Sequence, residues 1–143
     1  MNWIAWSLLS ALFAGLTAVL AKIGVGGVNP NLATAVRTAV VLIFTWGIAF
    51  ATTKPGAIRE FSGHTWLFLA LSGIATGLSW LCYFQALQSG EVSRVAPLDK
   101  LGVVFAILLA ALFLKEKLTF QHLAGGLLIV MGALILAWKN KSA

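Results

Sequence analysis

Three charged side chains interrupt the long apolar runs of this sequence, and they are the first candidates for chemistry. Arg37 lies within residues 32–52, and Asp99 and Lys100 lie near the start of residues 98–114. A charge near the middle of a bilayer costs at least ~2.5–3.5 kcal/mol on insertion scales, so such charges usually serve a function. Asp99, the one acidic residue inside such a run, is the candidate for proton or cation coupling. Arg37 is a candidate for attracting an anionic group or for pairing with Asp99.

Each charge also has a structural interpretation. The Arg37 side chain could extend to the nearer membrane surface and serve as an anchor. Asp99 follows Pro97 and would lie in a first helical turn, where a negative charge is favourable. Lys100 is interpreted as an interfacial anchor, and Glu116 as a loop residue with structural contacts. The sequence alone leaves these alternatives open.

Hydroxyl and aromatic side chains share faces of several predicted helices. Ser79, Trp80 and Tyr83 fall on one side of residues 66–88, where they could stack on and hydrogen-bond to an organic solute. Packing is the alternative, because small residues let helices approach and hydroxyls can bond to their own helix. The candidate pathway residues on these faces are Ser10, Thr17, Thr34, Arg37, Thr38, Thr76, Ser79, Trp80 and Tyr83.

The last apolar run, residues 120–138, carries a different kind of face. Gly125 and Gly132 lie on a narrow stripe with His122 and no polar group near its middle. Such a stripe favours close helix packing, and we expect it at a dimer interface. His122, near the start of this run, is interpreted as an interfacial histidine rather than a proton relay.

The elements that must position these residues are membrane helices. The chain has 143 residues, of which 60% are hydrophobic and 10% charged, and its mean hydropathy is +0.96. Helices of about 20 residues cross a hydrocarbon core of about 30 Å. The sequence therefore predicts an all-α integral membrane protein with one domain over residues 1–143. Its predicted spans are residues 3–21, 32–52, 66–88, 98–114 and 120–138.

Local signals mark where these helices begin. Asn29 followed by Pro30 predicts the start of the second helix, and Pro97 in the same way predicts the start of the fourth. Ser62 or Thr65 is expected to cap the third helix, and Thr119 the fifth.

The composition and motifs exclude several classes of function. The single Cys82 cannot form an internal disulfide, and no Cys/His cluster has the spacing of metal ligands, so neither a metal nor a cofactor is predicted. The common hydrolase and metalloprotease motifs are absent, which argues against an enzyme. The net charge is +6, and the basic residues lie in short gaps between apolar runs, which argues against nucleic-acid binding.

The basic residues hardly decide the orientation. Side A of the membrane, with the N-terminus and residues 53–65 and 115–119, carries Lys54, Arg59, Lys115 and Lys117. Side B, with residues 22–31, residues 89–97 and the C-terminal tail, carries Lys22, Arg94, Lys139 and Lys141. Arg37 and Lys100 begin their runs from side B and tilt the balance weakly toward a cytoplasmic C-terminus. Either one orientation or insertion in both orientations fits this balance.

The second half of the chain resembles a known transporter domain. The order of its features is typical of the EamA domain of the drug/metabolite transporter superfamily. These features are residues 79–98, then residues 108–119 with Lys115-Glu116-Lys117-Leu118-Thr119, and then the glycines of residues 121–132. Arg37, after Asn29-Pro30, also fits that pattern. This domain usually occurs twice in a chain, in opposite orientations.

The resemblance implies a half-size unit of a ten-helix inverted-repeat bundle. It implies a transporter of small organic metabolites or drugs, working by alternating access in a bacterial inner membrane. An odd number of spans can form an inverted pair when two copies insert oppositely, so we expect an antiparallel homodimer. The alternative is a non-transporting membrane subunit or regulator that packs with a partner membrane protein.

Overall fold

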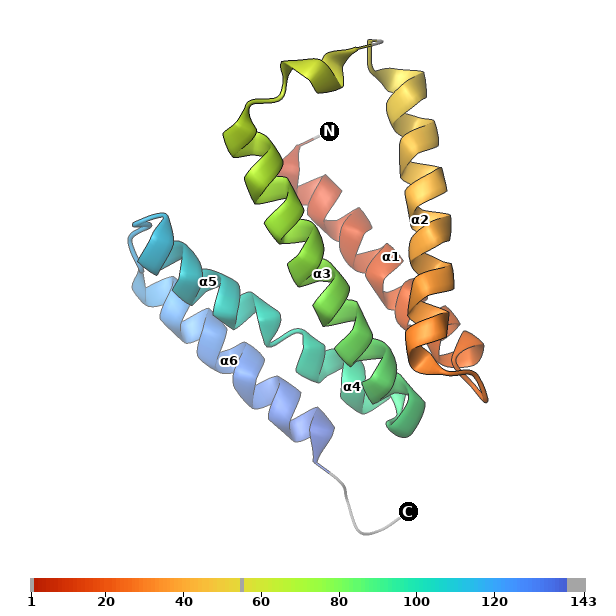
Figure 1. The fold of residues 1–143 in the computed structure, drawn as a ribbon. Coiled ribbons are helices and arrows are strands. Elements are labelled where there is room, and N and C mark those ends of the chain that lie inside the picture. Colours follow the sequence, from red (N-terminus) through yellow and green to blue (C-terminus); the bar gives the residue numbers. More distant parts are fainter. Residues whose placement is uncertain (1, 55, 139–143) are drawn as a thin grey trace. The chain divides into compact units, whose positions relative to one another are not determined.

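The computed structural model describes residues 2–54 and 56–138, and over these residues the chain is helical and has no strand. Figure 1 shows the helices in chain order. They are α1 (Trp3–Gly24), α2 (Pro30–Thr52), the 3₁₀ helix η1 (Ala57–Glu60), α3 (Gly63–Ser89), α4 (Val92–Asp99), α5 (Gly102–Phe113) and α6 (Phe120–Ala137). The predicted all-α fold is confirmed over the described residues.

These helices provide five candidate membrane spans among the described residues. Four of the spans are the single helices α1, α2, α3 and α6. The remaining span, fourth in chain order, consists of α4 and α5 together, over Val92–Phe113. Each span contains an 18-residue window of mean hydropathy between 1.7 and 2.0. The protein is therefore a multi-pass membrane protein with the predicted number of spans.

Three of the predicted helix starts are confirmed by hydrogen bonds. The Asn29 side chain accepts from the backbone N–H of Asn31 at 2.9 Å, directly ahead of Pro30 in the first turn of α2. Ser62 Oγ accepts from the Thr65 N–H at 3.1 Å at the start of α3. Each bond satisfies an N–H group that has no partner inside its helix.

The cap of α6 is reciprocal. Thr119 Oγ1 accepts from the His122 N–H at 3.3 Å, and His122 Nδ1 accepts from the Thr119 N–H at 3.4 Å. This arrangement is a capping box with histidine in the place of the usual Glu or Gln. It gives His122 a structural role at the helix start.

The predicted start of the fourth helix at Pro97 is wrong. The helix begins earlier, at Val92, so Pro97 lies inside α4 and Asp99 is the last residue of α4 rather than part of a first turn. Pro97 has no N–H, so the turn before it lacks one backbone hydrogen bond. The helix is interrupted only after the proline, at Lys100 and Leu101, whose N–H groups donate to the carbonyls of Pro97 and Leu98, three residues back.

The first and third helices, Trp3–Gly24 and Gly63–Ser89, extend beyond the predicted spans 3–21 and 66–88. Because α1 continues to Gly24, Lys22 lies in its last turn and donates from Nζ to the Gly90 carbonyl at 2.8 Å. Because α4 begins at Val92, Arg94 also lies in a helix rather than a loop. Lys139 and Lys141, which count toward side B, lie outside the described residues. The near balance of basic residues between the two sides stays a prediction from the sequence.

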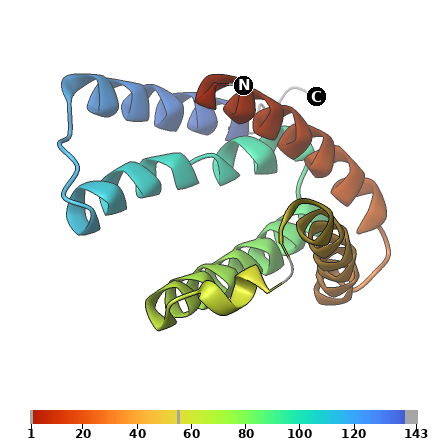
Figure 2. The ribbon, with the colours of Figure 1, turned by 90° about the horizontal axis from the view of Figure 1, so that it is seen from above.

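The chain divides into two compact units, residues 1–22 with 89–143 and residues 23–88. In the first unit α6 packs along α4 and also along α5, as Figure 2 shows. In the second unit the Gln88 side chain at the end of α3 donates to the Val28 carbonyl at 2.9 Å, just before α2. This bond joins one end of α2 to one end of α3.

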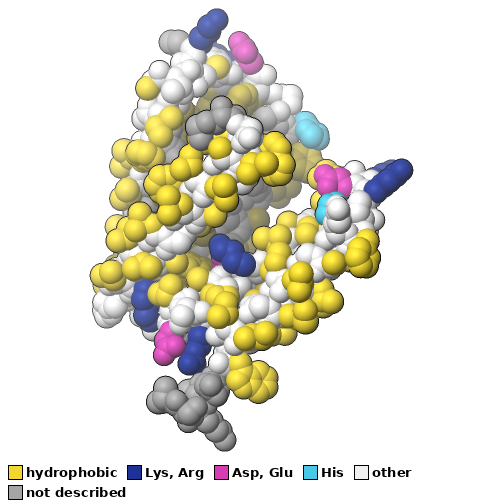
Figure 3. Space-filling model, turned by 180° about the vertical axis from the view of Figure 1, so that it is seen from behind, with side chains coloured by type: hydrophobic (Ala, Val, Ile, Leu, Met, Phe, Trp, Pro, Cys, Tyr) yellow, Lys and Arg dark blue, Asp and Glu magenta, His cyan; other side chains and the backbone are white. Residues whose placement is uncertain are grey.

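Few side chains are buried in the chain. The buried apolar residues of the described chain are Ala18, Ala21, Val25, Phe84, Leu87 and Ala133. Large apolar side chains such as Phe44 and Ile43 are exposed, and Figure 3 shows hydrophobic side chains distributed along the helices on the face that it displays. Exposure of so many apolar side chains to water is unfavourable, so this surface suits the interior of a membrane.

Candidate functional site

The candidate site in residues 23–88 is built around Arg37. Its guanidinium carbon lies 4.2 Å from the centroid of the Trp80 ring and 5.5 Å from that of Phe84. Trp80 and Phe84 are four residues apart on α3, so they lie on one face of that helix. Both distances are within the range of cation–π attraction. The structure therefore brings together Arg37 and Trp80, two of the predicted pathway residues.

The Arg37 guanidinium lies well inside the helical spans. Arg37 is seven residues after Pro30, and Trp80 is nine residues before Ser89, the last residue of α3. At about 1.5 Å per residue, both lie about 10–14 Å from these helix ends. The Val28–Gln88 bond joins the same two ends, so Arg37 and Trp80 lie at similar depth. This position favours a functional role for Arg37 over an anchor that reaches for the membrane surface.

The aromatic contacts stabilise this charge. Two cation–π contacts together contribute about 1–4 kcal/mol, which is comparable with the cost of at least ~2.5–3.5 kcal/mol for an arginine at a helix centre on insertion scales. Within the part of residues 23–88 that the structure describes, Arg37 makes no ion pair. The arrangement is therefore able to accept an anion. The alternative pairing of Arg37 with Asp99 stays a prediction.

The threonine hydroxyls of this region donate to their own helices. Thr34 Oγ1 donates to the Pro30 carbonyl at 2.8 Å, and Thr38 Oγ1 donates to the Thr34 carbonyl at 2.7 Å. On α3, Thr76 Oγ1 donates to the Ser72 carbonyl at 2.9 Å. A hydroxyl that donates in this way can still accept a hydrogen bond, but its proton is in use. These bonds favour the packing interpretation for all three threonines.

The other predicted pathway residues are distributed over two units. Ser79 is exposed and Tyr83 is half-buried on α3, the helix that carries Trp80. Ser10 is exposed and Thr17 half-buried on α1, in the other unit. A common pathway that includes both units stays a prediction.

Phe84 is a member of the site that sequence reasoning missed. Its side chain is 3% exposed, whereas Trp80 and Tyr83 are half-buried. Phe84 therefore supports the Arg37 side chain from a buried position, while Trp80 keeps an accessible surface. The signal that could have identified Phe84 is its spacing of four residues from Trp80.

Asp99 and Lys100 contact each other at the junction between α4 and α5. Lys100 Nζ lies 3.2 Å from Asp99 Oδ2, with 57% and 37% of the two side chains exposed. At the start of α4, Arg94 pairs with Glu91 at 3.1 Å. Exposed pairs of this kind contribute ~0–1 kcal/mol. Asp99 thus keeps an accessible carboxylate next to a break in a helix, and its proposed coupling role is untested.

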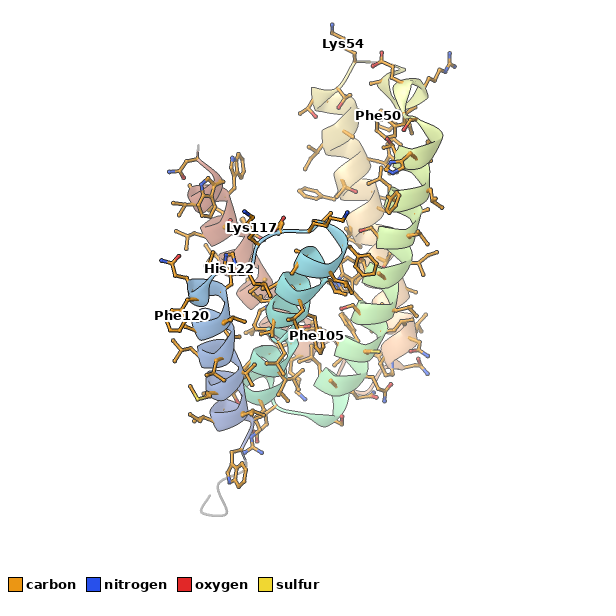
Figure 4. The ribbon with its side chains drawn as sticks, turned by 90° about the vertical axis from the view of Figure 1, so that its left-hand side faces the viewer. Phe50, Lys54, Phe105, Lys117, Phe120 and His122 are labelled. Carbon is orange, nitrogen blue, oxygen red and sulfur yellow. The ribbon has the colours of Figure 1, made fainter. Side chains whose placement is uncertain are left out.

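A cavity of about 530 Å³ lies at the other end of α2 and α3, beside η1. Its aromatic lining includes Trp46, Phe50, Phe61 and Trp66, and the ring centroids of Trp46 and Phe50 are 5.2 Å apart. Lys54 also contributes to the lining, and Figure 4 shows Phe50 and Lys54 at this end of α2. Aromatic residues and a lysine at the end of a span are typical of the membrane–water interface.

The predicted packing glycines face open space within the chain. Among the described residues, a Cβ atom added at Gly125 or Gly132 would meet no heavy atom within 4 Å other than its own helix backbone and chain neighbours. The same holds for Gly73 and Gly77 on α3. These open positions leave room for close approach by another helix.

Comparison with known proteins identifies the kind of membrane protein. The profile of the EamA-like transporter family matches residues 1–138. An uncharacterized transporter in the cobO 3′ region of Sinorhizobium sp. is 52% identical over 136 residues, which cover 95% of this chain and 96% of that protein. The uncharacterized transporter YvbV of Bacillus subtilis is 34% identical over 111 residues, which cover 72% of this chain but only 36% of YvbV.

A third relative is named as part of a flippase. The probable 4-amino-4-deoxy-L-arabinose-phosphoundecaprenol flippase subunit ArnE of Pseudomonas aeruginosa is 41% identical over 71 residues, or 50% of this chain and 60% of ArnE. No solved structure matches the chain.

Proposed function

The chain belongs to the EamA-like transporter family, and on this premise we propose that it carries small organic metabolites or drugs across the membrane as an antiparallel homodimer. Each copy would supply five spans of a ten-helix bundle, and the two copies would alternate access to a shared pathway. The three relatives described above come from bacteria, which supports placement in a bacterial inner membrane. The family supports transport rather than catalysis.

The observation that carries this proposal is the apolar surface of the five spans. At most 11% of the best apolar window in each span is buried within the chain. A polar pathway needs walls on all sides, and the exposed apolar faces of the spans are available to a second copy of the chain. A second copy would cover apolar faces and complete the walls.

The open glycines support the same assembly. Gly125 and Gly132 have room for another helix, as expected for a face between two copies. The near balance of basic residues between sides A and B supports insertion in both orientations, because neither side has the excess of Lys and Arg that would keep it in the cytoplasm. An odd number of spans needs this opposite insertion to form an inverted pair.

A second candidate function rests on the ArnE relative, whose name calls it a flippase subunit. The chain would then be a membrane subunit that packs with a different partner and moves no solute alone. The same apolar faces and glycines would contact that partner.

Transport by the purified protein distinguishes the two. The protein is reconstituted into liposomes and tested with a broad panel of labelled metabolites, with and without a pH gradient. Uptake of any solute above protein-free liposomes supports the transporter. Absence of uptake across the panel, from protein that is folded and dimeric, would favour the subunit.

A further inference from the structure

We propose that Arg37 and Trp80 form a recognition site for an oxyanion, a carboxylate or phosphate carried on an organic body. The guanidinium of Arg37 would bind the oxyanion, and the Trp80 ring would contact the organic body. This inference rests on the proposed transport function, because it names the chemical class of the substrate.

The first argument is the state of the Arg37 charge. The guanidinium lies inside the spans, over the Trp80 and Phe84 rings at 4.2 and 5.5 Å. Within the described part of residues 23–88 it donates no hydrogen bond to a protein acceptor. Since an arginine that stacks on an aromatic ring still offers its N–H fork, these donors can serve a bound anion.

The second argument is the geometry that arginine prefers. A guanidinium matches the two oxygens of a carboxylate or phosphate with two parallel hydrogen bonds. The aromatic contacts hold the guanidinium in place before any ligand arrives, which lowers the entropy lost on binding. An oxyanion therefore suits this site better than a spherical ion such as chloride.

The third argument is the surface around the charge. Trp80, whose ring lies against Arg37, is half-buried and keeps some accessible surface, whereas Phe84 is 3% exposed. Rings next to a fixed charge favour an amphipathic ligand over a bare inorganic ion. Such an oxyanion could belong to a water-soluble metabolite or to the headgroup of a lipid.

The test uses a matched pair of probes on the full chain in nanodiscs of phosphatidylcholine. The probes are 4-nitrophenyl phosphate, which is anionic, and 4-nitrophenyl glucoside, which is neutral. The nitrophenyl group quenches nearby indole fluorescence, and the signal of Trp80 is the difference between the wild type and Trp80→Phe. A separate arm adds phosphatidic acid to the nanodiscs and measures whether this lipid displaces 4-nitrophenyl phosphate and so restores the Trp80 fluorescence.

We expect the phosphate probe to quench Trp80 at lower concentration than the glucoside. Arg37→Gln should weaken phosphate binding about tenfold or more, since hydrogen bonds to charged groups are the stronger kind. Arg37→Lys, which keeps the charge but loses the fork, should give an intermediate loss, and glucoside binding should change in neither variant. If phosphatidic acid displaces 4-nitrophenyl phosphate, the site accepts the phosphate of a lipid headgroup; if it does not, the oxyanion is that of a water-soluble metabolite.

Two results would overturn the proposal. One is equal binding of the two probes to the wild type, a comparison that needs no variant to fold. The other is Arg37→Gln protein of native helicity that binds 4-nitrophenyl phosphate as tightly as the wild type does. Failure of transport is separate: Arg37-dependent binding without uptake of any solute contradicts the proposed function alone, and uptake that is independent of Arg37 contradicts the anion site alone.

Discussion

The guanidinium carbon of Arg37 lies 4.2 Å from the centre of the Trp80 ring, and the two residues lie at similar depth on α2 and α3. This contact joins an intramembrane charge to an accessible aromatic surface. It accounts for how a costly charge is held inside a span while its donors stay available. The contact is the structural basis of the candidate site.

Loss of the Trp80 ring should impair transport more than its replacement by another ring. Trp80→Leu removes the cation–π contact at 4.2 Å and leaves Arg37 with the more distant Phe84. We expect solute uptake in liposomes to fall about tenfold, which corresponds to about 1.4 kcal/mol and lies within the range of a desolvated cation–π contact. Trp80→Phe should retain most of the uptake.

Trp46→Leu is the matched control, because Trp46 lines the cavity at the other end of α2. Equal loss of uptake in Trp46→Leu and Trp80→Leu would show that the effect is general destabilisation. The predicted role of Trp80 would then be wrong.

Bulky residues on the α6 glycines should separate the copies without unfolding the chain. A Cβ atom added at Gly125 or Gly132 meets no neighbouring heavy atom within 4 Å among the described residues, so Gly125→Leu and Gly132→Leu place their bulk on an open face. We expect the dimer fraction in detergent, measured by light scattering, to fall in both variants. Gly47→Leu on α2, where space is equally open, is the control and should stay dimeric. Dimers that persist in all three variants would place the interface elsewhere.

The α6 cap should contribute measurably to stability. Thr119→Ala removes the acceptor of the His122 N–H, a bond of 3.3 Å. Loss of an N-cap of this type costs about 1 kcal/mol, and Thr119→Ser should restore most of it. The measurement is the midpoint of unfolding in mixed detergent micelles. An unchanged midpoint in Thr119→Ala would show that membrane packing alone determines where α6 begins.

Asp99 should be required if transport responds to protons. In the wild type a pH gradient should then change the rate of uptake, and in Asp99→Asn, which stays uncharged at every pH, the rates with and without the gradient should become equal. Lys100→Met is the control for the ion pair with Asp99 at 3.2 Å. A gradient effect that survives in Asp99→Asn would assign coupling to another group.

Helix starts and span number could be predicted from the sequence because they depend on neighbouring residues. Asn29-Pro30, Ser62 and Thr119 each satisfy N–H groups within a few residues, so their roles can be read locally. The long apolar runs need no tertiary information either, because the bilayer determines their length.

The start of α4 was mispredicted because two rules compete there. Proline is common in the first turn of a helix, and the polar residues before Pro97 are typical of a loop. The structure instead places a helix over Val92–Asp99 and tolerates the proline within it. The Glu91–Arg94 ion pair at 3.1 Å, three residues apart, supports that earlier start.

The partners of Arg37 could not be predicted because they are distant in sequence. The sequence suggested Asp99 as a partner of Arg37. The contacts with Trp80 and Phe84 depend on how α2 and α3 meet near Val28 and Gln88. Phe84 was missed for a further reason: an apolar side chain within an apolar run carries no signal of its own until the facing charge is known.

Topology of the C-terminus tests the central claim of opposite insertion most directly. The full chain is fused at its C-terminus to green fluorescent protein, which is fluorescent when cytoplasmic, or to alkaline phosphatase, which is active when exported. We expect signal from both fusions, because the copies insert in both orientations. Removing Lys54 and Arg59 from side A should shift the signal toward the cytoplasmic reporter. Activity of one reporter alone, with both fusions present in the membrane, would contradict the antiparallel dimer.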